Sequence, residues 1–202
     1  MEVNLFINQK TNGNTYVINR ENDCYIVDPG GFDMSESINY IKEKNYNLLG
    51  ILLTHGHYDH IIGIPEILEY KKVPVYVSEK DYEFLFDSTL SLSIWLDIDF
   101  KLSNDVEIVK LKENDDVFGL KVIETPGHTH GGICYYDKEN SILLSGDTIF
   151  KMNYGRTDLP TGSISGMKKS ISKLMNLPEN TTVYPGHGGE TIIKYEKEGY
   201  TY

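Results

Sequence analysis

The chain has 202 residues, 40% hydrophobic and 24% charged, which is the balance of a folded globular protein rather than a disordered one. Its 30 acidic and 19 basic residues give a formal net charge of −11, which disfavours nucleic acid and anionic membrane surfaces as partners. No apolar run exceeds four residues, whereas a transmembrane helix needs about 20, and no signal peptide is recognisable. We therefore expect a cytoplasmic protein with one domain over residues 1–202.

Strand and helix patterns alternate along the first half of the chain. Apolar runs and turn residues predict these elements in order: two strands within residues 15–30, a helix over 35–45 with Ser35 as a possible cap, a strand over 48–55, a helix over 64–72, a strand over 73–78 and a helix over 79–86. Residues 87–103 carry the single tryptophan and match no pattern well. They are compatible with a lid, a packed segment or a dimer contact.

The second half repeats the alternation. It predicts strands over 105–111, 120–126, 132–137, 141–147 and 182–186, a helix over 163–177 and a short helix near 189–197. Five residues share one face of the long helix: Ile164, Met167, Ile171, Leu174 and Met175. Cys24 and Cys134 lie within apolar strands, so we expect buried free thiols. Strands mixed with helices throughout indicate an α/β arrangement.

All six histidines lie in three short, glycine-containing segments, each after a predicted strand: residues 54–60, 125–132 and 184–189. Loops at strand ends are where α/β folds place their chemistry. The first segment packs four potential ligands into residues 55–60, too many polar groups to be core residues. Imidazole nitrogen and carboxylate oxygen are ligands of Zn²⁺ and Fe²⁺, and no cysteine lies nearby, so the pattern predicts a metal site that is not a structural thiolate site.

Together, four motifs resemble the metallo-β-lactamase-fold hydrolase superfamily. They are His55-x-His57-x-Asp59-His60, Gly127-His128-Thr129, Ser145-Gly146-Asp147-Thr148 and Pro185-Gly186-His187-Gly188, in the family's order. The resemblance implies an α/β (α+β) fold, the four-layer αββα sandwich, with a dinuclear metal site at one edge.

The resemblance also implies seven metal ligands, in two sets joined by one bridging carboxylate: His55, His57 and His128; Asp59, His60 and His187; and Asp147 between them. The cofactors would be two divalent ions, Zn²⁺ first, with Fe²⁺ or Mn²⁺ as alternatives. Two divalent ions outweigh the two aspartates, so the site would stay positive and attract an anionic substrate.

The mechanism implied by such a site is hydrolysis. A metal lowers the pKa of bound water from about 15.7 to about 7, so a bridging hydroxide would attack a carbonyl carbon. Asp59 would be catalytic because it can orient this nucleophile as well as bind metal. A thiol leaving group would need little help from an acid.

Residues 155–158, Gly-Arg-Thr-Asp, resemble the glyoxalase II-like branch, whose enzymes cleave thioesters such as S-lactoylglutathione. Arg156 matches a basic residue that contacts glutathione there, and a guanidinium suits a carboxylate. Alternatively, Arg156 pairs with Asp158 and braces the loop. Glyoxalase II proper has a further C-terminal helical region that is not seen after His187, so the resemblance is to short, single-domain members, and glutathione as the thiol carrier stays open.

Further expectations concern two other residues, the substrate and the oligomeric state. Asp28 ends a strand near the expected metal edge, where it would hydrogen-bond to a metal ligand or simply form a turn. His130 matches no ligand position. The substrate would be a small-molecule thioester, with an ester or lactone still open, and the protein a monomer or homodimer.

The main alternative is a persulfide dioxygenase of the same superfamily. It would use one Fe²⁺ held by His55, His128 and Asp147. The intact segment around His187 favours the hydrolase. A β-lactamase is disfavoured because a bridging Asp147 is the thioesterase pattern, and a non-catalytic metal protein because all seven ligands are present.

Overall fold

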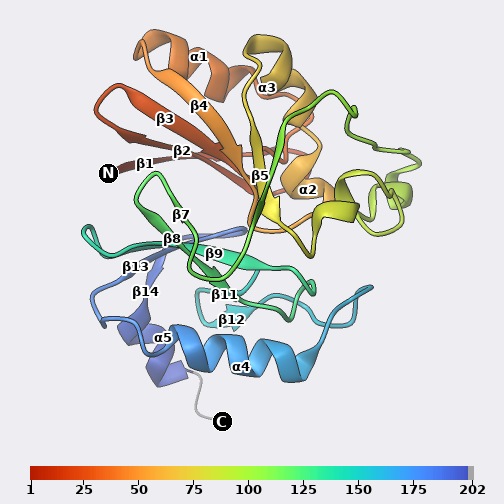
Figure 1. Ribbon diagram of the computed structural model, residues 1–202. Helices are drawn as coiled ribbons and strands as arrows, with labels where there is room; N and C mark the ends of the chain where they lie inside the picture. The colour runs from red at the N-terminus through yellow and green to blue at the C-terminus, as the bar shows by residue number, and fades with distance from the viewer. Residues whose placement is uncertain (200–202) are drawn as a thin grey trace. The chain divides into compact units, whose positions relative to one another are not determined.

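The computed structural model describes residues 1–199. The chain divides into two compact units: residues 1–77 with 82–110, and residues 78–81 with the chain from 111 onward. Each unit is built on one mixed six-stranded sheet flanked by helices (Figure 1).

The sheet of the first unit has its strands in sequence order: β1 (Glu2–Ile7), β2 (Asn14–Arg20), β3 (Asp23–Val27), β4 (Asn47–Leu52), β5 (Val75–Ser78) and β6 (Ile108–Leu111). Strands β1 to β3 are antiparallel, whereas β3, β4 and β5 run parallel. The carboxyl ends of β3 and β4 therefore meet at one edge of the sheet. The edge strand β1 was not predicted, because its residues are only partly buried.

The helices of this unit are α1 (Ser35–Glu43), the short α2 (Tyr58–Ile61) and α3 (Ile64–Tyr70). Figure 1 shows α1 and α3 beside each other on one face of the sheet, where Ile41 and Ile67 pack into one core with Ile51 of β4. The expected Ser35 cap is wrong. Ser35 is the first helical residue, and Glu66 of α3 accepts the backbone N–H of the capping residue Met34 instead.

The sheet of the second unit has the order β14-β13-β10-β9-β8-β7, with β7 (Asp116–Val117), β8 (Leu120–Glu124), β9 (Ile133–Asp137), β10 (Ile142–Gly146), β13 (Thr182–Pro185) and β14 (Thr191–Ile192). A hairpin of β11 (Ile149–Phe150) and β12 (Asn153–Tyr154) follows β10. Strands β10 and β13 are parallel neighbours. Strand β8 runs in their direction too, because β9 is antiparallel to both β8 and β10.

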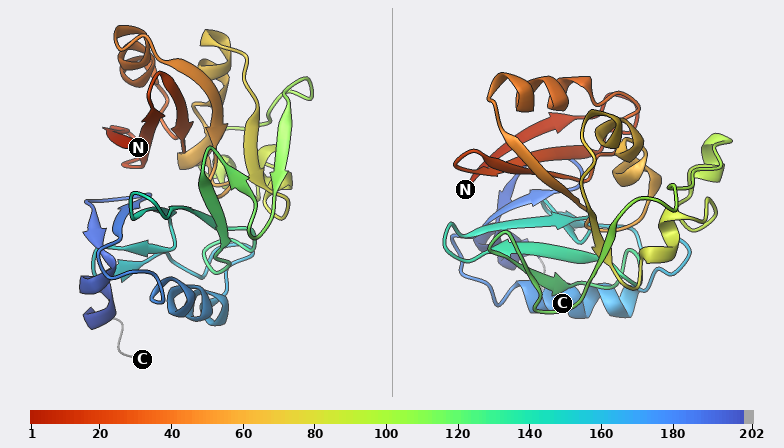
Figure 2. Two further views of the ribbon diagram at one scale, coloured as in Figure 1. Left: turned by 60° about the vertical axis from the view of Figure 1, so that its left-hand side comes forward. Right: turned by 45° about the horizontal axis from the view of Figure 1, so that its top comes forward.

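The second unit also contains α4 (Ile164–Leu174) and α5 (Ile193–Gly199) (Figure 2). Met167, Ile171 and Leu174 of α4 are buried in the core of this unit, as predicted. Ile164 is 47% exposed, so the prediction that it belongs to the buried face of the helix was wrong. It directly follows the cap Ser163, whose hydroxyl accepts the N–H of Gly166 and starts the helix there.

Residues 79–86 differ from expectation, and residues 87–103, for which no element was predicted, contain one short turn. The predicted helix over 79–86 is reduced to one 3₁₀ turn, Tyr82–Leu85, and a second turn spans Ser93–Leu96. Trp95 at this second turn is 61% exposed. The backbone N–H of Tyr58 donates to the carbonyl of Ser91 at 2.8 Å, so this segment lies against the first histidine motif.

Both cysteines are free and buried, as predicted. Burial raises the pKa of the Cys24 thiol to about 12, so it stays protonated at neutral pH. Among the described residues, no helix combines the length and the apolar character that crossing a membrane requires.

Candidate metal centre

Strand β4 delivers the first histidine motif at the carboxyl edge of the first unit's sheet. His55 and His57 lie in the connection after β4, and Asp59 and His60 lie in α2, which begins directly after His57. The three imidazoles are buried and close together: ring centroids lie 4.8 Å apart for His55 and His57, and 4.1 Å apart for His55 and His60. We call these four residues the first-unit cluster. The three buried imidazoles show that this motif is not a solvated loop.

Asp28, directly after the neighbouring strand β3, forms hydrogen bonds to the first-unit cluster and to the residue before it. Its Oδ1 accepts the backbone N–H of Thr54 at 2.8 Å, and its Oδ2 accepts the Thr54 hydroxyl at 2.7 Å. The same Oδ2 lies 3.0 Å from Nδ1 of His60. Because a carboxylate only accepts, Nδ1 of His60 carries the proton, and Nε2 is the atom left for a metal. The sequence did not single out Thr54.

Replacing Asp28 by alanine should weaken metal binding by about 10–100-fold, because the His60 ring loses the partner that fixes its tautomer and orientation. Competition with a chelator measures this affinity. Asp23→Ala is the matched control. Asp23 begins the same strand, and its Oδ1 accepts a hydrogen bond from the exposed side chain of Asn47 rather than from a histidine. Wild-type affinity in a folded Asp28→Ala protein would leave Asp28 as a turn residue only.

The other predicted ligands lie at one edge of the second unit's sheet. His128 follows β8, Asp147 follows β10 and His187 follows β13. These three strands run in the same direction, so their carboxyl ends meet. We call these three residues the second-unit cluster.

Two histidines converge on one carboxylate oxygen in the second-unit cluster. Nε2 of His128 lies 3.4 Å and Nε2 of His187 lies 3.6 Å from Oδ2 of Asp147. Nδ1 of His128 donates to the backbone carbonyl of Arg156 at 2.8 Å, which directs Nε2 toward Asp147. Oδ2 of Asp147 therefore lies near one nitrogen from each of two histidines that the resemblance assigns to different metal ions.

Arg156 forms a bidentate pair with Asp158, with Nε and Nη2 donating at 2.8 and 2.7 Å. These hydrogen bonds and the guanidinium charge lower the pKa of Asp158 to about 2. Both side chains are exposed, so the pair is ionised but well solvated. His130 is exposed, and its backbone N–H donates to Thr161.

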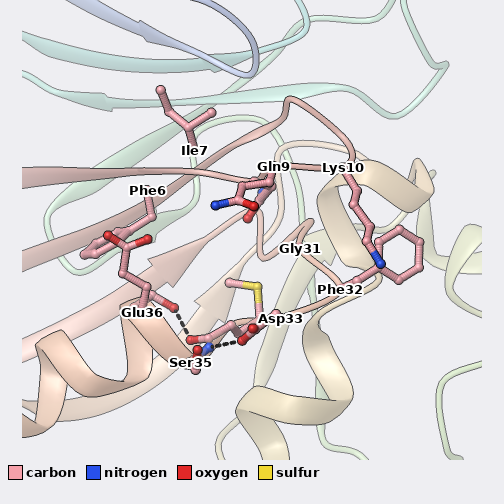
Figure 3. A pocket seen from close by; sticks show the side chains of 12 residues that line it. Phe6, Ile7, Gln9, Lys10, Gly31, Phe32, Asp33, Ser35 and Glu36 are labelled. Carbon is pink, nitrogen blue, oxygen red and sulfur yellow. Dashed lines mark hydrogen bonds between the residues drawn. The ribbon is translucent and has the colours of Figure 1, made fainter.

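A cavity of about 420 Å³ in the first unit was not foreseen (Figure 3). The β1–β2 loop and the segment before α1 line it, and the amine of Lys10 lies 5.5 Å from the centre of the Phe32 ring. Gly31 forms part of its wall. The neighbouring Gly30 packs directly on the backbone of Asp59, so the cavity is close in sequence and space to the first-unit cluster.

Imidazole nitrogens and carboxylate oxygens in two mostly buried clusters fit divalent metal ions, as does the lack of thiolates in either cluster. Comparison with known proteins points to the same class of metal-binding protein. The model of the metallo-beta-lactamase superfamily matches residues 9–187.

Two curated relatives are similar over most of their length. One is the "Probable metallo-hydrolase YqgX" of Bacillus subtilis, 38% identical over 92% of this chain and 89% of its own. Another is the "Hydroxyacylglutathione hydrolase GloC" of Haemophilus influenzae, 32% identical over 88% and 85%.

Two solved structures share the fold. A structure described as BLEG-1 B3 metallo-beta-lactamase has a TM-score of 0.90 and 32% identity, covering 98% of this chain and 97% of its own. TTHA1623 in a di-iron-bound form has a TM-score of 0.88 and 27% identity, covering 98% of both chains.

This chain therefore belongs to the metallo-β-lactamase superfamily, and its two mixed sheets with flanking helices match the αββα class that the motifs predicted. Within the superfamily it is a small metal-dependent hydrolase with histidine-rich metal sites. The likeness to GloC agrees loosely with the glyoxalase II-like branch.

Proposed function

We propose that this protein is a dinuclear metal hydrolase that cleaves the thioester of a small acid. In this proposal the two clusters would hold two ions with the ligand sets implied by the resemblance, and Asp147 would be the ligand shared between them. Zn²⁺ is the first candidate metal, and the di-iron form of TTHA1623 makes iron the second. A single observation carries the proposal: both His128 and His187 direct Nε2 at the same oxygen of Asp147.

The chemistry that bound metals supply in such sites is Lewis acidity toward a carbonyl and a lowered pKa for water. The histidines and Asp59 of the first-unit cluster differ in their exposure to solvent. In the first-unit cluster the histidine side chains are almost fully buried, whereas the Asp59 side chain is 20% exposed. Asp59 is therefore the carboxylate that can reach a solvent molecule and accept its proton, consistent with a catalytic role.

The choice of a thioester rests on the leaving group and on GloC. A thiol has a pKa of about 8.5, so it departs as thiolate without a proton donor. Apart from Asp59, the residues of the two clusters are assigned to metal binding alone, so a leaving group that needs no proton donor suits this site better than an amine does. GloC, described as a hydroxyacylglutathione hydrolase, supports the same substrate class.

The test begins with elemental analysis of protein purified without chelators or an affinity metal. About two metals per chain and release of free thiol from an S-lactoyl thioester are the expected results. One iron per chain with oxygen uptake on a persulfide would instead favour the dioxygenase. Two metals with no thioester cleavage would reject the thioesterase.

A β-lactam is the second candidate substrate, because the BLEG-1 structure is as similar in sequence as GloC is. A chromogenic cephalosporin therefore belongs in the same assay. Turnover of the cephalosporin well above that of every thioester would replace the first proposal with this one.

Two variants distinguish substrate binding by Arg156 from its alternative role, which is to brace the loop by pairing with Asp158. If the guanidinium binds a substrate carboxylate, Arg156→Ala should raise KM about tenfold for an anionic thioester and little for a neutral one. Asp158→Ala should then lower KM for the anionic thioester, because it releases the guanidinium. If the pair only braces the loop, both variants should impair both substrates alike.

A further inference from the structure

The loop that carries the predicted ligand His128 forms hydrogen bonds to other segments both before and after this residue. On one side, α4 holds the residues just before it: the Ser163 N–H donates to the carbonyl of Gly127 at 2.8 Å, and the Ser170 hydroxyl donates to that of Pro126 at 2.7 Å. On the other side lies Asp81, which comes from the turn after β5 and which neither the motifs nor the comparisons assign.

Asp81 and Thr129 are both fully buried. The Thr129 hydroxyl donates to Oδ2 of Asp81 at 2.7 Å, a short distance typical of a bond to a charged acceptor. The same carboxylate packs on Gly131, where an added Cβ would lie 2.3 Å from Oδ1. Asp81 thus contacts the loop one and three residues after His128. Burying a carboxylate is costly unless it is hydrogen-bonded, so the Thr129 hydroxyl is an important partner of Asp81.

The turn that carries Asp81 is itself well anchored. Residues 78–81 cluster with the second unit, although the segments before and after them belong to the first. Within the second unit, the N–H of Glu79 donates to the carbonyl of Leu111 at 3.0 Å, and Nζ of Lys80 donates to Glu124 at 2.6 Å. These bonds connect the turn that carries Asp81 to other segments of the second unit.

We infer that Asp81 is a positioning residue for His128, acting through Thr129 and Gly131. With α4 fixing the chain before His128 and Asp81 fixing the chain after it, the imidazole is held while Nδ1 bonds to the carbonyl of Arg156. Metal binding at His128 then needs little reordering of the loop. The inference rests on the proposed metal-dependent function.

The first experiment measures Zn²⁺ affinity by competition with a chelator. Thr129→Val removes the hydroxyl with little change in shape, and Asp81→Ala removes the carboxylate. Each should weaken Zn²⁺ binding about 10–100-fold, as partners of metal ligands do. The double variant should bind Zn²⁺ no more weakly than Asp81→Ala alone, because the Thr129 hydroxyl acts through the Asp81 carboxylate. Thr129→Ser, which keeps the hydroxyl, should bind Zn²⁺ like the wild type.

Asp116→Ala is the matched control, an exposed aspartate of the same unit that accepts the N–H of Gly119. It should leave Zn²⁺ affinity unchanged. Wild-type affinity in Thr129→Val overturns the inference. So does an equal loss in Thr129→Ser. A lowered Tm of the metal-free Asp81→Ala protein with unchanged Zn²⁺ affinity would show a merely structural role and also overturns it.

The second experiment needs no metal. The N–H groups of Thr125 and Gly127 bond within the loop, to the carbonyls of Gly132 and Thr129. Their hydrogen exchange in metal-free protein should be faster in Thr129→Val than in the wild type, and unchanged in Asp116→Ala. Unchanged exchange overturns the inference. If the wild type bound no Zn²⁺, the proposed function would fail, and exchange would still decide whether Asp81 holds the loop.

Discussion

Replacing Asp147 by asparagine is expected to remove nearly all hydrolysis. The amide keeps the shape of the side chain but not the charge that two cations would share. Loss of this stabilisation should lower kcat/KM by roughly 10³-fold, since metals in such sites contribute several kcal/mol to the transition state. Elemental analysis should show metal content falling below about two per chain.

His187→Ala should act similarly and should leave the fold intact, because the His187 side chain is 28% exposed and its loss opens no core cavity. His130→Ala is the matched control, an exposed histidine two residues from a predicted ligand. It should keep full metal content and activity. Full metal content with undiminished hydrolysis in His187→Ala would contradict the ligand assignment.

Gly30→Ala is expected to have the largest effect on stability. A Cβ at this position would lie 1.5 Å from the backbone oxygen of Asp59 and 2.9 Å from the nitrogen of His60. Backbone must move to admit it, at a cost of about 3 kcal/mol, which for a chain of this length lowers Tm by roughly 6–12 °C. The displaced atoms belong to two predicted ligands, so metal affinity should fall as well.

Gly189→Ala provides the control, because an added Cβ there meets nothing within 4 Å although the residue is close to His187. Its Tm and metal affinity should match the wild type. Thermal unfolding with and without added Zn²⁺ measures both quantities. A Gly30→Ala protein that melts like Gly189→Ala would show that the contact with Asp59 relaxes without cost.

The candidate ligands were recognisable in the sequence because they come in short motifs, and a motif is local information. His55, His57, Asp59 and His60 fall within six residues, so their meeting depends on one loop and one helical turn. Most strands and the long helix α4 were also predictable, because alternation and the helical repeat reflect which side of a single element is buried.

Contacts between residues distant in the sequence were predictable only in part: the resemblance placed Asp28 near a metal ligand without identifying that ligand, and no motif indicated Asp81. Asp28 meets His60 across 32 positions, and Asp81 meets Thr129 across 48. The edge strand β1 lacks a clear pattern because its environment, not its composition, makes it a strand. Residues 79–86 likewise take a 3₁₀ turn against their helical pattern.

The sequence by itself determined the family, the donor types and the candidate ligands, because metal chemistry selects particular side chains at short spacings. Only the tertiary structure decided which of those side chains face one another and what holds them. The parallel pairing of β10 with β13 brings Asp147 beside His187, and a buried carboxylate bonds to each of the first two histidine motifs, Asp28 to His60 and Asp81 to Thr129. Such pairing depends on strand order and packing, and these are set by contacts across the whole sheet.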